Sequence, residues 1–348
     1  MAAVTHASRA LVRAVRPGEG RAVAALWREL WEAHERWGGY AGSRDPRVYA
    51  QVASRLDDDA RVRSGRVVLG RHVHLVAEID GVACGQVEGW LDHLGAAADT
   101  PLTCEVRSLI VAPGARRSGA GRALLHGLAD ATRARAGAAA CVLAAEVLDP
   151  NPAHSFYARV GYAPVSWSAR IEALYGIRPG PTAFGVRVAG PYDALAIARL
   201  EGALAQRRRE AGDARFDRPH AIDATLVEAI AAQLHDNGDG GSAPRDSTIL
   251  VAADDAGGVR AAASFAVQVL EPPFLPVRRA LLGRFALDVA HPPSQLLAAL
   301  VSFSCRLALS RGAQFIELTD LTAPDTDLYR AAVATGARPW SRIVTRAA

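Results

Sequence analysis

The chain has 348 residues, of which 50% are hydrophobic and 22% are charged. This length suits two domains, and the composition is that of a folded globular protein rather than a disordered chain. All 40 basic residues counted as lysine or arginine are arginine, because the sequence contains no lysine. A Schiff-base lysine, a lysine general base and a phosphate-binding loop of the form GxxxxGK[ST] are therefore excluded.

The charges and cysteines exclude further classes of protein. The formal net charge is +4 and the arginines form no clustered basic stripe, so no nucleic-acid partner is expected. The acidic run 57–59 and the arginine run 207–209 fall in helix-like stretches, so we expect both on solvated faces. The four cysteines lie far apart and have no CxxC spacing, so neither a disulfide framework nor a metal site is expected.

No part of the sequence has the composition of a membrane segment. No stretch approaches about 18 uninterrupted apolar residues, and the N-terminal segment lacks the apolar core of a signal peptide. We therefore expect a soluble, cytoplasmic protein with no membrane partner.

The first half alternates strand-like and helix-like segments. Leu26 and Leu30 recur at the spacing of an amphipathic helix, and Asp80-Gly81 is a strong two-residue turn signal between two strand-like runs. In chain order we expect a strand at 11–16, helices at 21–37 and 46–63, hairpin strands at 74–79 and 82–90, a strand at 104–111, a helix ending near 136, a strand at 141–147, a short helix at 153–160 and a strand at 162–171.

The second half repeats this order at an offset of roughly 171 to 178 residues, which argues for a duplicated fold. Tyr157, for example, has a counterpart in Tyr329. The sequence therefore predicts an α/β (α+β) protein with two tandem domains, 10–175 and 183–348, each a mixed, mostly antiparallel sheet flanked by helices. The Pro- and Gly-containing stretch 176–181 is expected to link them.

The segment Glu105–Leu125 carries the strongest chemical signal. A strand ends at Val111, and the run RRSGAG at 116–121 leads directly into a helix. Glycines let a backbone approach a ligand closely, and a helix start offers unpaired N–H groups at the positive end of the helix dipole. This arrangement favours a diphosphate-binding loop.

Two motifs resemble those of the GNAT superfamily of acetyl-CoA-dependent N-acetyltransferases. The pattern V-x-P-x-x-R-x-x-G-x-G-x-x-L-L, from Val111 to Leu125, resembles the family's acetyl-CoA-binding motif. The run from Asn151 to Tyr162 resembles its N-x-x-A-x-x-F-Y-x-x-x-G-[FY] motif. The close resemblance covers about residues 10–171, and it implies a tandem GNAT chain that uses acetyl-CoA as co-substrate.

The resemblance also implies the residues that hold acetyl-CoA. The end of the central strand would part from the strand at 141–147 and bond the pantetheine arm, while the loop would hold the pyrophosphate. Asn151 would lie near the pantetheine or thioester, although its position before Pro152 equally suits a helix N-cap. The implied cofactor-binding residues are Leu109, Ile110, Val111, Arg116, Arg117, Ser118, Gly119, Ala120, Gly121, Arg122, Asn151 and Phe156.

The family's catalytic groups are matched by two residues. Tyr157 matches the usual general acid, and a phenol is protonated at neutral pH and able to donate; packing against the sheet is the alternative interpretation. Glu105 lies on the central strand where several members keep a glutamate base, although a salt bridge to Arg107 would also explain it. Glu146 is the next candidate base, but Glu317 occupies the corresponding place in the second half, which weakens a purely catalytic interpretation.

The acceptor is expected to meet the first two helices and the hairpin, where aromatic and acidic residues gather, although half of these tryptophans could belong to the core. Such residues would suit a cationic amine of a small molecule or peptide. They are Trp27, Trp31, Trp37, Tyr40, Glu32, Glu35, His34, Trp90, Asp92 and His93.

The second half departs from the acetyl-CoA-binding motif. After Val289 the chain reads AHPPS, and proline has no N–H to give to a phosphate. We expect a degenerate GNAT-like domain that could complete the acceptor site or mediate a homodimer. An aminoglycoside- or antibiotic-type N-acetyltransferase is an alternative within the enzyme class, and a non-catalytic acyl-CoA sensor is the alternative outside it.

Overall fold

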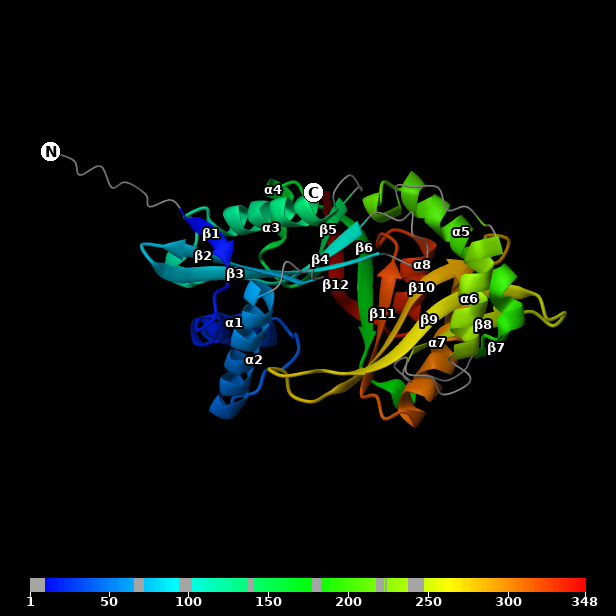
Figure 1. Cartoon of the computed structure of the whole chain (residues 1–348). Helices are drawn as coiled ribbons and strands as arrows, with labels where there is room; N and C mark the ends of the chain where they lie inside the picture. Colours follow the sequence, from blue (N-terminus) through cyan, green and yellow to red (C-terminus); the bar gives the residue numbers. More distant parts are fainter. Residues whose placement is uncertain are drawn as a thin grey trace.

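The computed structural model describes residues 10–65, 72–93, 102–136, 141–176, 183–216, 222, 224–236 and 247–348. Its strands form one continuous 12-stranded sheet in the order β1-β2-β3-β4-β5-β12-β6-β11-β10-β9-β8-β7. The first half of the chain lies at the left of Figure 1 and the second half at the right.

The first half supplies half of the strands and four α-helices. Its elements are β1 (Leu11–Ala14), α1 (Gly20–Arg36), α2 (Pro46–Gly65), β2 (His72–Ile79), β3 (Val82–His93), β4 (Leu102–Val111), the 3₁₀ turn η1 (Pro113–Ala115), α3 (Ala120–Ala136), β5 (Cys141–Leu148), α4 (His154–Arg159), β6 (Ala163–Ile171) and η2 (Leu174–Gly176).

The second half repeats the same order of strands and α-helices. Its elements are β7 (Gly185–Val188), η3 (Pro191–Asp193), α5 (Ala194–Glu210), η4 (Ala214–Phe216), α6 (Ala224–Asp236), β8 (Ser247–Ala253), β9 (Val259–Val269), β10 (Arg278–Leu287), α7 (Pro293–Ser310), β11 (Phe315–Leu321), α8 (Asp327–Ala334) and β12 (Arg338–Ala347).

The last strands of the two halves are exchanged. The C-terminal strand β12 pairs with β5 of the first half, whereas β6 pairs with β11 of the second half. The two exchanged strands also pair with each other, antiparallel, at the centre of the sheet. The predicted repeat of elements is therefore present, but the two expected sheets are joined into one, and each half contains a strand of the other.

Helices cover both faces of this sheet. In the first half, α1 and α2 lie below the sheet in Figure 1 and α3 lies above it. Leu124, Leu125 and Leu128 of α3 are fully buried against β2 to β5, whereas Val23 and Trp27 of α1 pack with α2 on the opposite face. In the second half, α5 and α6 share one apolar cluster with the sheet, and α7 and α8 share another.

Local sequence signals account for several boundaries. Asp80 and Gly81 adopt φ values of 50° and 80°, as the tight turn between β2 and β3 requires. Asp57 of α2 accepts the backbone N–H groups of Gly18 and Gly20, which satisfies donors at the start of α1. All four cysteines are buried.

One charge run lies differently from its expectation. Arg208 is only 6% exposed, and it donates hydrogen bonds to the carbonyl oxygens of Val165 and Asp320. The expectation of a solvated face is wrong at this residue, because tertiary contacts from β6 and β11 supply the acceptors that its buried guanidinium needs.

Among the described residues, no helix is both long enough and apolar enough to span a lipid bilayer. The expected linker at 176–181 lies outside the described residues except for Gly176.

Candidate active site

The central feature of the first half is the parting of two parallel strands. Residues of β4 and β5 are paired only from Leu102 with Cys141 to Val106 with Ala145, although both strands continue beyond this point. Ser108 adopts a φ of 53°, beside a register shift between β3 and β4, which marks a bulge. Among the described residues, no strand pairs with the edge of β4 that faces β5 near Leu109 to Val111, an arrangement like the one that the family resemblance implies.

The loop after β4 presents backbone donors. Gly119 adopts a φ of 90° immediately before α3, a conformation that suits glycine, and Arg117 also has a positive φ of 69°. Among the described residues, no acceptor is found for the N–H groups of Arg117, Gly119, Gly121 and Arg122. These donors at the start of a 17-residue helix fit a diphosphate.

The three arginines of the loop have different surroundings. Arg116 donates to the carbonyl oxygen of Val111 at 3.1 Å and lies 3.4 Å from Glu29 of α1, so it braces the loop against the strand and helix. Arg117 and Arg122 are exposed, and within the described parts of the chain their guanidinium groups have no partner. They are the two cations free to contact phosphates.

The turn before α4 holds Asn151. Its side-chain oxygen accepts the backbone N–H of Ala153 at 2.9 Å within the turn before α4. The N-cap interpretation of Asn151 is wrong, because the N-cap residue of α4 is Ala153. Phe156 of α4 lies against the loop: a Cβ added to Gly121 would come within 3.3 Å of the Phe156 ring. Glycine at 121 therefore allows α3 and α4 to approach each other beside the parted strands.

Tyr157 lies on α4 among other aromatic rings. It is 8% exposed, with ring centres 5.5 Å from Phe156 and 5.3 Å from Tyr162. Burial raises the pKa of the Tyr157 phenol, so the hydroxyl remains protonated and able to donate. Both interpretations of the sequence, a packed aromatic residue and a proton donor, are compatible with this place.

The opposite face of the sheet carries Glu105. Its carboxylate forms an ion pair with Arg107 at 2.6 Å, and both side chains are about half exposed, at 48% and 53%. Glu105 lies directly across from Trp90 of β3, and the Arg107 guanidinium lies over the Trp90 ring. The ion pair that the sequence offered as an alternative is therefore present.

Glu146 occupies the neighbouring strand one residue beyond the last β4–β5 pair. It is exposed, whereas the other residues of β5 are buried. Although part of the Glu146 side chain contacts solvent, burial of its carboxyl group among neighbouring protein atoms raises the carboxyl pKa, and the nearby Glu317 carboxylate adds to this effect. The Ser341 hydroxyl donates to Glu146 at 2.5 Å.

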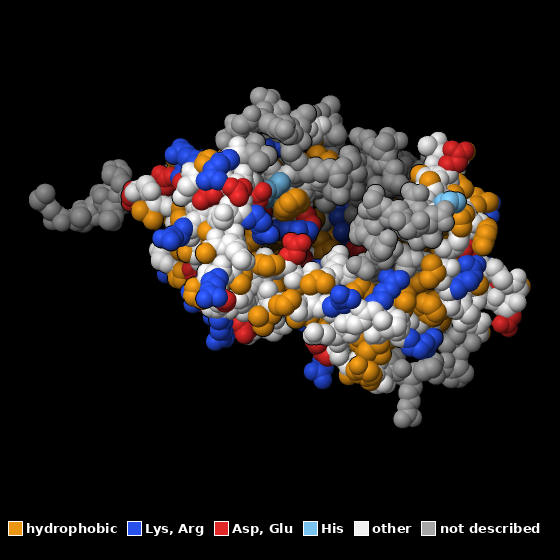
Figure 2. Space-filling view, turned by 60° about the horizontal axis from the view of Figure 1, so that its bottom comes forward, with side chains coloured by type: hydrophobic (Ala, Val, Ile, Leu, Met, Phe, Trp, Pro, Cys, Tyr) orange, Lys and Arg blue, Asp and Glu red, His pale blue; other side chains and the backbone are white. Residues whose placement is uncertain are grey.

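Figure 2 shows a hollow with acidic and basic side chains in the middle of the molecule, between the two halves.

A buried polar cluster joins the halves beside Glu146. Glu317 accepts hydrogen bonds from Tyr40, which follows α1, from Arg170 of β6 at 2.6 Å, and from Arg279 of β10 at 3.1 Å. Arg170 also lies over the Trp340 ring. Tyr40, expected near the acceptor, thus belongs to a structural contact between the halves, and no local sequence signal marked Arg279 or Ser341.

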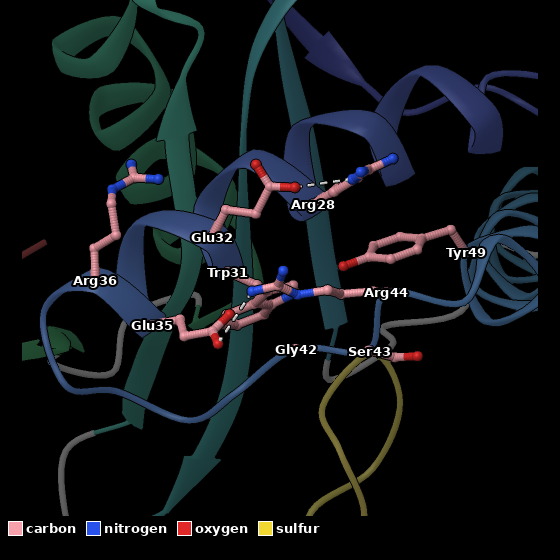
Figure 3. Close-up of a pocket in the computed structure, with 9 residues that line it drawn as sticks. All are labelled: Arg28, Trp31, Glu32, Glu35, Arg36, Gly42, Ser43, Arg44 and Tyr49. Carbon is pink, nitrogen blue, oxygen red and sulfur yellow. Dashed lines mark hydrogen bonds and ion pairs between the residues drawn. The ribbon is translucent and has the colours of Figure 1, made fainter.

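A pocket of about 410 Å³ opens between α1, the following segment and α2, and Figure 3 shows its lining. Three residues expected near an acceptor line it: Trp31, Glu32 and Glu35. Its acids are already close to arginines, since Glu32 pairs with Arg28 at 3.0 Å and Glu35 lies 3.6 Å from Arg44. Trp27, in contrast, is part of the core, and the side chains of residues 92 and 93 lie outside those described.

One group of side chains on the hairpin has the composition of a metal site. Single ligand atoms of His72, His74 and Glu88 lie within 4.8 Å of one another. Hydrogen bonds join His72 to Glu88 at 3.1 Å and His74 to Gln86 at 2.8 Å. These bonds account for the cluster as a polar network on the same face as Glu105.

Comparison with known families agrees with this geometry. Residues 24–162 match the model of the Acetyltransferase (GNAT) family, and this segment contains the parted strands, the loop and Tyr157. This segment of the chain is therefore similar to the GNAT family. A search of curated proteins finds no significant match.

Solved structures show that the GNAT fold occurs twice in the chain. A tandem GNAT protein from the clavulanic acid biosynthesis pathway is 18% identical, covers 97% of this chain and 98% of its own, and has a TM-score of 0.52. A GCN5-related N-acetyltransferase from Sphaerobacter thermophilus is 16% identical, covers 97% and 96%, and has a TM-score of 0.58. At these identities the likeness concerns the fold: two GNAT-like units in tandem.

Proposed function

We propose that this tandem GNAT protein is an N-acetyltransferase that transfers an acetyl group from acetyl-CoA to a primary amine of a small molecule or peptide. The observation that carries the proposal is the parting of β4 from β5 directly before a loop with unpaired N–H groups. An exposed strand edge and a helix N-terminus in sequence suit a ligand with an amide-containing arm and a diphosphate.

The reaction needs a proton acceptor for the amine and a proton donor for the departing thiolate. Tyr157 donates its proton to the sulfur as the carbon–sulfur bond breaks. Glu105 takes the proton of the attacking amine in the arrangement that the sequence favours. Glu146 is the second candidate for this role, supported by its exposure at the end of the paired region and by the absence of an arginine ion pair to it among the described residues.

Two alternatives differ from this proposal in the acceptor or in the chemistry. An aminoglycoside- or antibiotic-type N-acetyltransferase would use the same residues with a polycationic acceptor. A non-catalytic tandem module would bind acyl-CoA without turnover. The acceptor amine, the lack of nucleic-acid or membrane partners and the formation of a homodimer remain predictions.

Calorimetry with acetyl-CoA and a free-thiol assay with a panel of primary amines separate these functions. One binding site per chain together with turnover supports the proposal. Two sites per chain would contradict a degenerate second unit. Binding without turnover across a broad panel, aminoglycosides included, would favour the non-catalytic module.

A further inference from the structure

The strand exchange brings a side chain of the second half to the acidic residue beside the parted strands. Ile343 of β12 lies directly across from Glu146, and Ser341 lies two residues earlier on the same face. The Ser341 hydroxyl is buried, at 2% exposure for the residue, and donates to one oxygen of the Glu146 carboxylate at 2.5 Å. This hydrogen bond joins the two halves, because Ser341 lies 195 positions after Glu146 in the sequence.

The charged groups around Glu146 already have partners of their own. Arg279 and Glu317 are bonded to each other and to Tyr40. Glu105, on the other side, is paired with Arg107. Glu146 is close enough to interact through charge with Glu105, Arg279 and Glu317. Its charge also acts on Tyr40. Ser341 is the side chain that forms a hydrogen bond with Glu146 within the described part of the chain.

We propose that the second half completes the acetyl-transfer site, with Ser341 as a positioning residue that orients the Glu146 carboxylate toward the ammonium group of a small cationic amine. The inference rests on the proposed function and takes its second candidate, Glu146, as the base, because Glu105 is already paired with Arg107. One carboxylate oxygen accepts the Ser341 O–H, which leaves the other to receive a proton from the acceptor. One proton moves from the ammonium group to Glu146, and the neutral nitrogen attacks the acetyl carbon. As the carbon–sulfur bond breaks, Tyr157 protonates the sulfur, the tyrosinate takes the second proton from the nitrogen to leave the neutral amide, and Glu146 releases its proton to solvent.

This role gives Ser341 a specific effect on pH dependence. A hydrogen bond donated to a carboxylate favours its charged form and lowers its pKa, so removal of the hydroxyl raises the pKa of Glu146. The acid limb of the kcat/KM profile should therefore move to higher pH in Ser341→Ala. We expect about a fivefold loss of kcat/KM on the acid side and a smaller loss on the alkaline plateau, because Glu146 is already ionised on the plateau and only its orientation is affected there.

Three variants test the proposal. Ser341→Ala removes the hydroxyl, Ser341→Thr keeps it and should restore the wild-type profile, and Thr345→Val is the matched control on the same face of β12. Carbon-13 NMR titration of glutamate carboxyl groups provides a second measurement that needs no turnover, with Glu146→Gln used to assign the signal. Ser341→Ala should raise the Glu146 titration midpoint, and the control should leave it unchanged.

The outcomes separate this inference from the proposed function. A wild-type protein that binds acetyl-CoA but acetylates no amine refutes the proposed function, and with it the role of Ser341. An active wild-type protein whose Ser341→Ala profile and titration match the wild type refutes the positioning role alone. A rate loss in Ser341→Ala that is equal at every pH, or an equal shift in Thr345→Val, also overturns it.

Discussion

Both halves contain two parallel strands that part, but the halves differ in the groups that a ligand could contact there. β10 parts from β11 after the Leu282–Leu318 pair, as β4 parts from β5, and Arg284 adopts a φ of 52°, close to the 53° of Ser108. In the second half, however, Arg284 is paired with Glu201 at 2.5 Å and lines a small cavity of about 50 Å³.

The loops that follow these strands differ more sharply. In the second half the Asp288 carboxylate accepts the N–H of Ala290 at 3.0 Å and lies 3.3 Å from Arg260. Pro292 and Pro293 then open α7 without N–H groups. An anionic side chain and two prolines thus lie where the first half has N–H groups and two arginines without a partner in the described parts of the chain. The comparison shows that two units of the same fold can differ in the backbone donors of this loop, and under the proposed function this difference assigns acetyl-CoA to the first half.

The largest expected effect comes from replacing Gly119 in the loop between β4 and α3. Gly119→Pro should abolish acetyl-CoA binding in calorimetry, because proline cannot adopt the φ of 90° found at this position. His291→Ala, in the corresponding loop of the second half, is the control and should leave the affinity unchanged. Retained binding in Gly119→Pro would show that the first loop does not hold the cofactor.

A smaller effect is expected from Tyr157 of α4, whose counterpart in the second half is Tyr329 of α8. Tyr157→Phe should lower kcat by about 100-fold while acetyl-CoA affinity stays within twofold, because the lost hydroxyl acts on the departing sulfur. Tyr329→Phe, the same change at the buried counterpart, should leave kcat unaltered. Equal turnover in wild type and Tyr157→Phe would remove this residue from the mechanism.

The arginines sharpen the comparison of the loops further. Arg122→Ala should weaken acetyl-CoA binding by about fivefold in calorimetry, since one charge-assisted contact to a phosphate is lost. The effect should shrink at high salt, because this guanidinium is exposed. Arg260→Ala in the second half should leave acetyl-CoA affinity unchanged. A comparable loss of affinity in this variant would indicate that the second half binds acetyl-CoA.

The smallest effect concerns an ion pair that both halves share. Arg13 of β1 bonds Glu19, and Arg187 of β7 bonds Asp193; these bonds lower the pKa of both carboxyl groups. A lowered folded-state pKa contributes stability above the unfolded-state pKa, and this contribution is lost as pH falls through the folded-state value. Thermal unfolding from pH 7 to pH 3 should therefore decline less steeply in Glu19→Gln and Asp193→Asn, by about 1 kcal/mol or less each. Unchanged slopes would show that these pairs add nothing to acid sensitivity.

Much of the fold was accessible from local signals. The Asp80-Gly81 turn and the repeated order of elements correctly indicated the strands and helices of both halves, because turn chemistry and apolar periodicity act over a few residues. Arg208 shows where this reasoning ends: a run of three arginines looks solvated, yet partners from distant strands bury the middle one.

The sequence by itself determined the family resemblance, the loop at 116–121 and the loss of this loop in the second half, because glycine, proline and the N–H groups of a helix start act locally. Only the tertiary structure decided that β6 and β12 change places, that Glu105 is paired with Arg107, and that Ser341 reaches Glu146. The pairing of strands depends on packing between residues far apart in the chain, so a local sequence pattern does not determine it.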